Sequence, residues 1–407
     1  MQTRHARFCG IDVGKAKHVA CVIEADGQVV LRSQSFLNDA AGYQQILVRL
    51  QQAGGPAQVL VGMEATGHYW YALHDFLTRH GYQVAVLNPI QTAQQARQGI
   101  RKSKTDRLDA HHIAILLKNG EYRPALIPGE LAMTCRQLTR LRYAMVRQTS
   151  RIKQLIGSRL QPVWPEYEGL FTDLFAPTSR KLLAAAPTPA DVLAMDPQAL
   201  TDLIRLASRG KFAAGKAQEI LSAAQDSVGM KRALDGARIG IRTLLTTLDA
   251  WRPIRQHLEV EIESLANQLP QYFLTLPGAN PLRAVSLYGE TDPIGHFASS
   301  DQLVAFAGLD PVVFQTGQYE APRRHISKRG SPVLRQTLWL MAHAAVRQEG
   351  SLRDFWLRKR EHGLHYLAAV TAAAAKLCRI SWRVLTDQRD YVPEGCPAKH
   401  LCSTAKS

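Results

Sequence analysis

The sequence predicts an α/β domain at the N-terminus, followed by a mainly α-helical arm and a small helical C-terminal domain. In the first 120 residues, short apolar runs alternate with longer helix-like stretches, which is typical of a mixed α/β domain. Beyond Gly129, apolar residues recur at the three- and four-residue spacings of amphipathic helices. A chain of 407 residues is also too long for one ordinary core. We therefore expect domains at 1–125, 126–270 and 271–392, and a flexible tail at 393–407.

The N-terminal elements follow a recognisable order. Three apolar strands are expected first, the second and third joined by a turn at Asp26-Gly27, and helices then alternate with further strands. The predicted order is β-β-β-α-β-α-β-α, which is that of the RNase H-like fold. The expected strands are 8–12, 18–23, 29–36, 59–63 and 83–87, and the expected helices are 40–52, 69–80 and 105–118.

The arm is predicted from an apolar stripe with basic residues interleaved. The stripe indicates a long amphipathic helix or a coiled coil, and consists of Leu138, Leu141, Met145, Ile152, Ile156 and Leu160. The interleaved basic residues are Arg136, Arg140, Arg142, Arg147, Arg151, Lys153 and Arg159. A helical insertion is expected over about 180–268. After the break at Leu276-Pro277-Gly278, helices are expected near 282–289, 331–348 and 365–387.

The charge of the chain restricts the class of partner. Its 50 Lys and Arg against 34 Asp and Glu give a net charge of +16 and a pI of about 9.7, which favours a polyanion, either nucleic acid or an anionic membrane surface. Residues 321–390 hold 14 basic against 5 acidic residues, a local net charge of +9, and are the strongest candidate for contacts with phosphates.

A membrane location is not expected. The apolar runs at 338–346 and 367–375 are well short of the roughly 20 residues that cross a bilayer, and no signal peptide is recognised. The six cysteines are scattered and form no C-x-x-C pair, which is typical of reduced thiols. We expect a bacterial cytoplasmic protein that associates with the nucleoid.

Four acids stand where an RNase H-like domain can gather them. Asp12 and Glu64 each end a predicted apolar strand, where an uncompensated carboxylate is unfavourable. Asp106 and Asp109 are three residues apart near the start of a predicted helix, so they project from one face. Taken singly, each acid is more simply explained as a helix cap, a turn residue or half of an ion pair.

Taken together, the four acids predict a site for two divalent cations. Hard Mg²⁺ or Mn²⁺ ions prefer oxygen ligands, and a pair of ions about 4 Å apart can assist phosphodiester chemistry. Three histidines, His68, His111 and His112, lie close to these acids in the sequence and leave a zinc site open as an alternative.

At this point the motifs resemble a known family. Gly10-Ile-Asp-Val-Gly-Lys15, Met63-Glu-Ala-Thr-Gly67 and Lys104-Thr-Asp-Arg-Leu-Asp-Ala110 look like the three blocks of the DEDD transposases of the insertion sequence 110 family, to which the pilin-gene invertases are related. Phe306-Ala-Gly-Leu-Asp-Pro311 and Ser327-Lys-Arg-Gly330 look like the C-terminal transposase domain of the same family.

The resemblance implies a RuvC-like catalytic domain, a helical arm used for assembly as a homo-oligomer, and a C-terminal domain that supplies a nucleophilic hydroxyl. The hydroxyl would attack double-stranded DNA at the element ends and the target, forming a covalent protein–DNA intermediate. Members of the family are associated with a structured guide RNA, which implies that base pairing supplies much of the sequence choice.

The chain departs from the family pattern at the nucleophile. The family has a serine before a glycine at this point, whereas this sequence has Thr316 before Gly317. Thr316 is the favoured nucleophile, with Ser327 and Ser331 as alternatives, and an impaired copy or a plain turn threonine also stays open. The residues expected to bind nucleic acid are Arg323, Arg324, Lys328 and Arg329 near this position, and Arg140 and Arg147 on the arm.

Two other classes compete with a recombinase. A sugar or acetate kinase with an actin-like fold shares the RNase H core and the Asp12-Val-Gly-Lys15 turn, but needs a duplicated second α/β domain that the sequence does not indicate. A non-catalytic DNA-binding protein would keep the charge and leave the acids as ordinary surface residues. A tyrosine recombinase is disfavoured because its Arg, His-x-x-Arg and Tyr set is not recognised.

Overall fold

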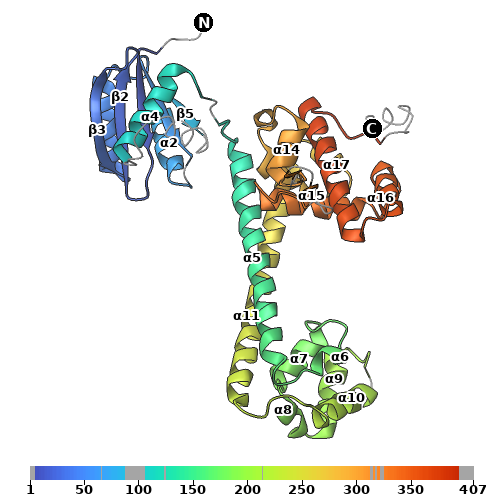
Figure 1. Ribbon diagram of the computed structural model, residues 1–407. Helices are drawn as coiled ribbons and strands as arrows, with labels where there is room; N and C mark the ends of the chain where they lie inside the picture. Colours follow the sequence, from blue (N-terminus) through green and yellow to red (C-terminus); the bar gives the residue numbers. More distant parts are fainter. Residues whose placement is uncertain are drawn as a thin grey trace, which may run out of the picture. The chain divides into compact units, whose positions relative to one another are not determined.

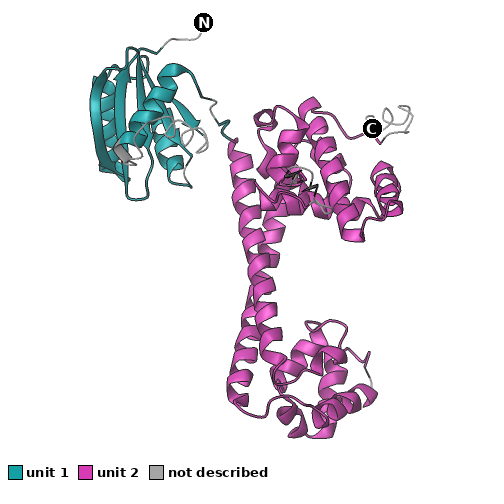
Figure 2. Ribbon diagram, viewed as in Figure 1, with its two compact units in different colours: residues 1–127 teal, residues 128–407 magenta. Residues whose placement is uncertain are grey.

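The computed structural model describes residues 5–65, 67–87, 106–122, 125–212, 214–311, 315–316, 319–320 and 325–393. The chain forms two compact units, residues 1–127 and residues 128–407 (Figure 2). Each unit has its own hydrophobic core. No helix in the described part of the chain is long and apolar enough to cross a membrane.

The first unit is built on a mixed five-stranded sheet. Its strands are β1 (Arg7–Asp12), β2 (Lys17–Glu24), β3 (Val29–Leu37), β4 (Val59–Glu64) and β5 (Gln83–Leu87), in the order β3-β2-β1-β4-β5. The first three strands pair antiparallel, while β4 lies parallel to β1 and β5 parallel to β4. The five strands predicted for the RNase H-like domain are confirmed, and they form a mixed sheet.

Helices cover both faces of this sheet. On one face, α1 (Ala40–Gln52) and α2 (Trp70–Arg79) pack on alternate residues of the central strands, such as Ile11 and Met63. On the other face, α4 (Asp106–Asn119) packs against the intervening residues, such as Leu60 (Figure 1). Because side chains alternate along a strand, one residue in two faces α4.

Glycines allow α4 to lie directly on the sheet. A Cβ added at Gly10 would stand 2.0 Å from the carbonyl oxygen of Ala110, and one added at Gly62 would stand 2.7 Å from the side chain of Leu117. Near the other end of α4, Lys118 lies beside Gly27 in the turn between β2 and β3. Since that turn is at the amino end of β1, α4 runs antiparallel to β1, and its first turn comes to the carboxyl end of the strand.

The second unit is helical. Two 31-residue helices, α5 (Glu130–Leu160) and α11 (Leu234–Ser264), pair antiparallel, since Arg142 bonds Glu259 and Arg159 lies against Gly240. At one end of this pair, Ile156 and Ile241 join the core of the helices inserted between α5 and α11. These helices are α6 (Tyr167–Leu170), α7 (Pro177–Ala185), α8 (Pro189–Leu193), α9 (Pro197–Ala207) and α10 (Ala214–Gln225).

At the other end of the pair, Cys135 and Ile262 join the core of the C-terminal helices. These are α12 (Tyr272–Thr275), α13 (Pro281–Thr291), α14 (Ser300–Ala307), α15 (Pro332–Ala345), α16 (Ser351–Glu361) and α17 (Tyr366–Asp387), with 3₁₀ turns η1 (Leu265–Gln268) and η2 (Ile294–His296). The sequence did not indicate α14, which has eight residues, or α16, in which Leu352 is the one buried side chain. Two short strands, β6 (Gln315–Thr316) and β7 (Tyr319–Glu320), pair antiparallel between α14 and α15.

The contact between α4 and β1 leads to a prediction about stability. Gly10→Ala should lower the free energy of unfolding of the first unit by about 3 kcal/mol, because the new Cβ would overlap the backbone of α4. Gly157→Ala is the control: Gly157 is inside α5 with nothing within 4 Å of an added Cβ, so alanine should stabilise by about 0.5–1 kcal/mol. Calorimetry of the full chain measures both, and a Gly10→Ala variant as stable as the wild type would contradict this packing.

Candidate functional site

Asp12 and Glu64 end neighbouring strands of the sheet. The parallel register pairs Ile11 of β1 with Met63 of β4, so the next residues, Asp12 and Glu64, come side by side at the carboxyl ends. Side chains two residues apart on a strand lie on the same face of the sheet. Asp12 therefore shares a face with Gly10, and Glu64 with Gly62, and both glycines face α4. The two carboxylates therefore belong to the α4 side of the sheet, and both residues are half-buried.

The start of α4 comes to the same edge. Asp109 is half-buried and precedes Ala110, whose backbone touches Gly10 two residues before Asp12. Asp106 is the first residue of α4, and its side chain lies outside the described residues. The backbone thus directs two strand ends and the first turn of one helix toward a single edge. Carboxylate oxygens are the ligands that hard divalent cations prefer, but the structure does not bring the described acids Asp12, Glu64 and Asp109 close enough together to hold a metal ion.

Two of the three histidines near these acids have other contacts. His111 Nδ1 lies 3.7 Å from Cys21 Sγ on β2, and burial lowers the pKa of this imidazole. The His68 ring lies against the Tyr69 ring, with centroids 4.4 Å apart and the planes tilted by 41°. Among the side chains that the structure describes, no three His, Cys, Asp or Glu residues are grouped closely enough to hold a metal ion, and that set does not include Asp106.

In the second unit, two glycine-containing segments pack backbone against backbone. Gly308 and Gly330 both have a positive φ, 66° and 73°, and a Cβ at either position would stand 2.2 Å or less from a carbonyl oxygen of the other segment. Ser327 N–H donates to the carbonyl of Asp310 at 2.8 Å, and Pro311 bridges Ile326. These contacts close the base of the loop from which β6 and β7 extend.

The three candidate nucleophiles have different surroundings. The Ser327 hydroxyl donates to the Asp310 carboxylate. The Ser331 side chain is buried; it donates to Glu290 at 2.7 Å and accepts from Leu334 N–H at 3.1 Å as the N-cap of α15. Thr316 lies in β6 with its backbone paired to Tyr319, while its side chain and Gly317 lie outside the described residues. Both serine hydroxyls are therefore already used within the fold.

Arg140 is held by a buried carboxylate. Its guanidinium makes two hydrogen bonds to Glu290 of α13, at 2.7 and 3.0 Å, and the Glu290 side chain is fully buried. Ser331 donates to the same carboxylate. Glu290 thereby links α5, α13 and the start of α15. We had predicted Arg140 as a nucleic-acid contact; about half of its side chain is exposed, but its charge is already paired.

Of the other arginines of α5, some are bonded within the fold and some are exposed. Arg136 donates to the carbonyl of Gly289 at 2.6 Å, and Arg142 pairs with Glu259. Arg147 and Arg151 are exposed, and within the described residues no carboxylate pairs with either. Arg147 lies over the ring of Tyr143 at 5.9 Å.

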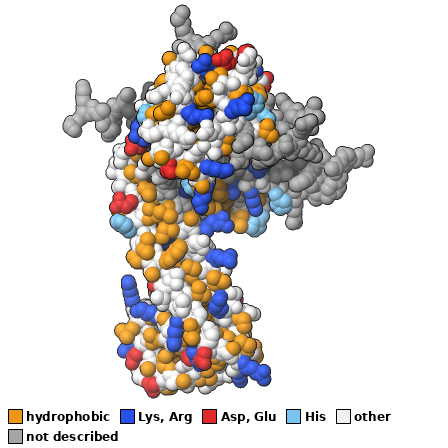
Figure 3. All heavy atoms as spheres, turned by 90° about the vertical axis from the view of Figure 1, so that its left-hand side faces the viewer, with side chains coloured by type: hydrophobic (Ala, Val, Ile, Leu, Met, Phe, Trp, Pro, Cys, Tyr) orange, Lys and Arg blue, Asp and Glu red, His pale blue; other side chains and the backbone are white. Residues whose placement is uncertain are grey.

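The predicted basic residues of the C-terminal region are only partly described. Lys328 and Arg329 are exposed in the loop before α15, and Lys328 has a φ of 54°. Arg323 and Arg324 lie outside the described residues. Lys and Arg side chains also lie along the face of the molecule drawn in Figure 3.

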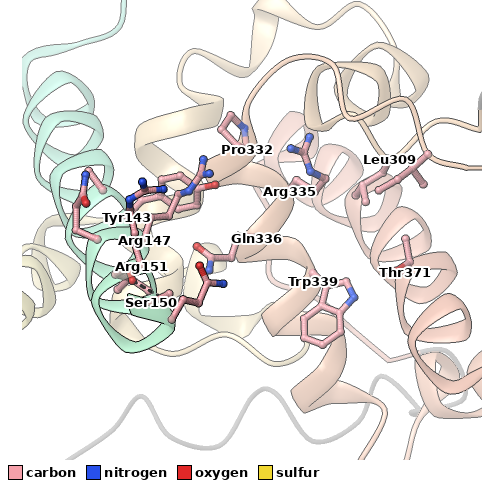
Figure 4. A pocket seen from close by; sticks show the side chains of 15 residues that line it. Tyr143, Arg147, Ser150, Arg151, Leu309, Pro332, Arg335, Gln336, Trp339 and Thr371 are labelled. Carbon is pink, nitrogen blue, oxygen red and sulfur yellow. Dashed lines mark hydrogen bonds between the residues drawn. The ribbon is translucent and has the colours of Figure 1, made fainter. Parts of the chain in front are cut away.

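A groove with a volume of about 780 Å³ lies between α5 and α15. As Figure 4 shows, α5 contributes Tyr143, Arg147 and Arg151, and α15 contributes Arg335 and Trp339. Sequence patterns do not indicate this groove, because Arg335 and Trp339 are far from α5 along the chain and belong to no motif.

Comparisons with known proteins agree with this arrangement. Residues 9–165 match a family model described as a transposase, and residues 271–357 match a model described as the IS116/IS110/IS902 family of transposases. Together the two matches cover more than half of the chain. The chain belongs to this transposase family. The family resemblance predicted from the sequence motifs is thereby confirmed.

Individual relatives are similar over different lengths. An insertion element IS116 protein of 44.8 kDa from Streptomyces clavuligerus is 26% identical, covering 97% of this chain and 98% of that protein. A pilin gene-inverting protein from Moraxella bovis is 30% identical over 25% of this chain and 31% of that protein. A solved structure of Thermus thermophilus RuvC with a Holliday junction substrate is 15% identical with a TM-score of 0.23, covering 30% of this chain and 100% of that chain.

Family membership disfavours the alternative classes considered from the sequence. A kinase with an actin-like fold would need a second α/β domain. The described residues of the second unit contain one sheet, made of the two-residue strands β6 and β7. A transposase, by contrast, cleaves and recombines DNA, and the net charge of +16 suits that substrate.

The Glu290 network leads to a second prediction. Arg140→Ala should lower the free energy of unfolding of the second unit by about 3 kcal/mol, because it leaves a fully buried carboxylate without its cation. Adding Glu290→Gln should recover part of this loss, since the amide oxygen can still accept from Ser331. Urea denaturation measures both variants.

The control for this pair is Arg79→Ala. Arg79 pairs with Asp75 on an exposed face of α2, with 69% and 64% of the two side chains exposed, so its loss should cost less than about 0.5 kcal/mol. If Arg140→Ala were no more destabilising than Arg79→Ala, the buried ion pair would not support the second unit.

Proposed function

We propose that this transposase family member cuts and rejoins the DNA strands of an insertion sequence through a metal-assisted centre on Asp12, Glu64, Asp106 and Asp109. The observation that carries the proposal is the register of β1 and β4, which brings Asp12 and Glu64 together on the face that α4 covers. Since α4 begins at the same edge, its two acids complete the set.

The donor chemistry fits Mg²⁺ or Mn²⁺. Four carboxylates would hold the ions, and no Cys or His is needed as a ligand. When bound, such ions lower the pKa of a coordinated hydroxyl and stabilise the leaving oxygen of a phosphodiester. The protein contributes rigidity: Asp12 and Glu64 stand on central strands, and α4 cannot move away from β1 without opening the contact at Gly10.

Thr316 is the nucleophile in this proposal. Its hydroxyl oxygen would form an ester with the scissile phosphate, the phosphorus–oxygen bond to the neighbouring nucleotide would break, and the departing oxygen would take up a proton. The hydrogen bonds of Ser327 to Asp310 and of Ser331 to Glu290 support this choice, because each serine would have to abandon a partner before it could attack.

The substrate would be double-stranded DNA at the element ends and the target. A structured guide RNA as a second partner is inferred from the family resemblance, and Lys328, Arg329 and Arg147 are the described residues offered for phosphate contacts, with Arg323 and Arg324 beside them in sequence. Assembly as a dimer or tetramer is supported by exposed apolar side chains on the long helices: Leu141, Ile254 and Val260 are 52–62% exposed. Such a protein would work in the bacterial cytoplasm, at the nucleoid.

Replacing one carboxylate should separate catalysis from binding. In Asp12→Asn, strand cleavage in Mg²⁺ should fall at least a hundredfold because a ligand charge is lost, while DNA affinity should change less than about twofold. Asp75→Asn is the control: it also removes one carboxylate from the first unit, on the exposed side of α2. Cleavage of labelled DNA and electrophoretic mobility shifts measure the two properties. Normal cleavage by Asp12→Asn would remove Asp12 from the centre.

The nucleophile can be tested by trapping. Thr316→Ala should abolish the covalent protein–DNA adduct on a suicide substrate, and Thr316→Ser should keep or raise it, because serine lacks the methyl group that hinders approach. Mass spectrometry of the linked peptide identifies the residue. Ser327→Ala serves as the matched control and should retain the adduct. An adduct mapped to Ser327, Ser331 or a tyrosine would transfer the role to that residue.

A further inference from the structure

The groove between α5 and α15 has the charge of a phosphate-binding surface. It is lined by three arginines, Arg147, Arg151 and Arg335, and its lining includes no Asp or Glu. Arg335 donates to the carbonyl of Ala307 at 3.0 Å, which fixes its side chain at the wall of the groove. Arg147 and Arg151 are two turns and three turns beyond Arg140 on the same face of α5, but no acid among the described residues pairs with them as Glu290 pairs with Arg140.

The groove also offers aromatic surface. The Trp339 indole is partly exposed in the lining and is backed by His343, whose ring is nearly parallel at 5.1 Å and 10°. On the opposite wall, the Tyr143 ring supports the guanidinium of Arg147. Gln148, Gln154 and Gln336 add amide groups that can donate to and accept from a base edge.

This combination selects one kind of ligand. Bases in a duplex are stacked on one another, so an aromatic side chain can stack on a base only when the strand is unpaired. Arginines beside an aromatic platform are typical of grooves that follow a single strand. The groove lies between two helices of one unit and combines exposed arginines with the partly exposed Trp339.

We propose that the groove between α5 and α15 binds an unpaired segment of nucleic acid, with phosphates on Arg147 and Arg151 and a base against Trp339. The inference rests on the proposed function, because it assumes a nucleic-acid substrate or guide. The groove reaches Leu309 and Ile326, next to the Pro311–Ile326 bridge that closes the base of the loop carrying Thr316. A strand held here is therefore delivered to the foot of the segment that carries the nucleophile.

The test uses the full chain and fluorescent 12-nucleotide single strands of DNA and of RNA, with a 12-base-pair duplex for comparison. Arg147→Ala combined with Arg151→Ala should weaken single-strand binding at least tenfold and reduce the slope of log K against log salt by about 1.4, from two lost phosphate contacts. Duplex binding should weaken by a smaller factor, because Lys328 and Arg329 remain for duplex phosphates. The control, Lys211→Ala with Arg232→Ala, removes two exposed charges from the segments before and after α10 and should change neither affinity more than twofold.

Photochemistry tests the base contact separately. A single strand carrying 5-iodouracil should cross-link to the peptide that contains Trp339, and the Arg147→Ala, Arg151→Ala variant should lose this cross-link. Weakening of both single-strand and duplex binding by equal factors, weakening as large in the control, or cross-links confined to other peptides would each overturn the proposal. A preference for RNA or for DNA would identify which strand occupies the groove.

Failure of the groove proposal and failure of the catalytic proposal would give different results in the binding and cleavage assays. If the wild type binds single strands through the groove but shows no metal-dependent cleavage, the proposed centre fails and the groove stands. If the wild type cleaves DNA while the Arg147→Ala, Arg151→Ala variant binds single strands as the control does, the groove proposal alone is overturned.

Discussion

The second unit depends on one buried carboxylate, Glu290. A carboxylate removed from water is strongly unfavourable unless a cation and hydrogen-bond donors compensate it. Glu290 receives two hydrogen bonds from Arg140 and one from Ser331. Because these three residues come from α13, α5 and the N-cap of α15, the same compensation fixes the base of the arm against the C-terminal helices. The wall of the groove and the loop between α14 and α15 are both built from elements joined by this network.

The same principle explains which basic residues remain for a ligand. A polyanion can be bound only by cations that the fold has not already neutralised. On α5, Arg140 and Arg142 pair with acids of the neighbouring helices, and Arg136 donates hydrogen bonds to carbonyls at the end of α13. Arg147 and Arg151 have no such acid among the described residues, and they stand where α5 faces α15. Net charge alone could not make this distinction, since all five arginines contribute equally to +16.

The sequence was informative wherever the deciding interaction was local. Short apolar runs predicted the five strands and placed Asp12 and Glu64 at the ends of two of them, because a buried strand is a short run of successive apolar residues. Helix α16 was missed because it buries little more than Leu352 and so has no apolar stripe. The partners of Arg140 and the lining of the groove were also missed. They join residues 150 or more positions apart, which no spacing rule reaches.

The structural role of four glycines depends on contacts with distant parts of the chain. The sequence predicts Gly10 and Gly62 in strands and places Gly308 and Gly330 in motifs, but it does not indicate what any of them contacts. In the structure, each lies where another backbone or a core side chain leaves no space for a Cβ. The first pair holds α4 on the sheet and so brings its first turn to Asp12 and Glu64. The second pair closes the loop that presents Thr316.

The acids and the hydroxyl belong to separate compact units. In the proposed mechanism these rigid parts must be brought together, within one subunit or between two, before a phosphate can be attacked. A centre divided in this way would protect DNA from cutting by a subunit that has not assembled on its target, because neither unit would carry both the proposed metal ligands and the proposed nucleophile.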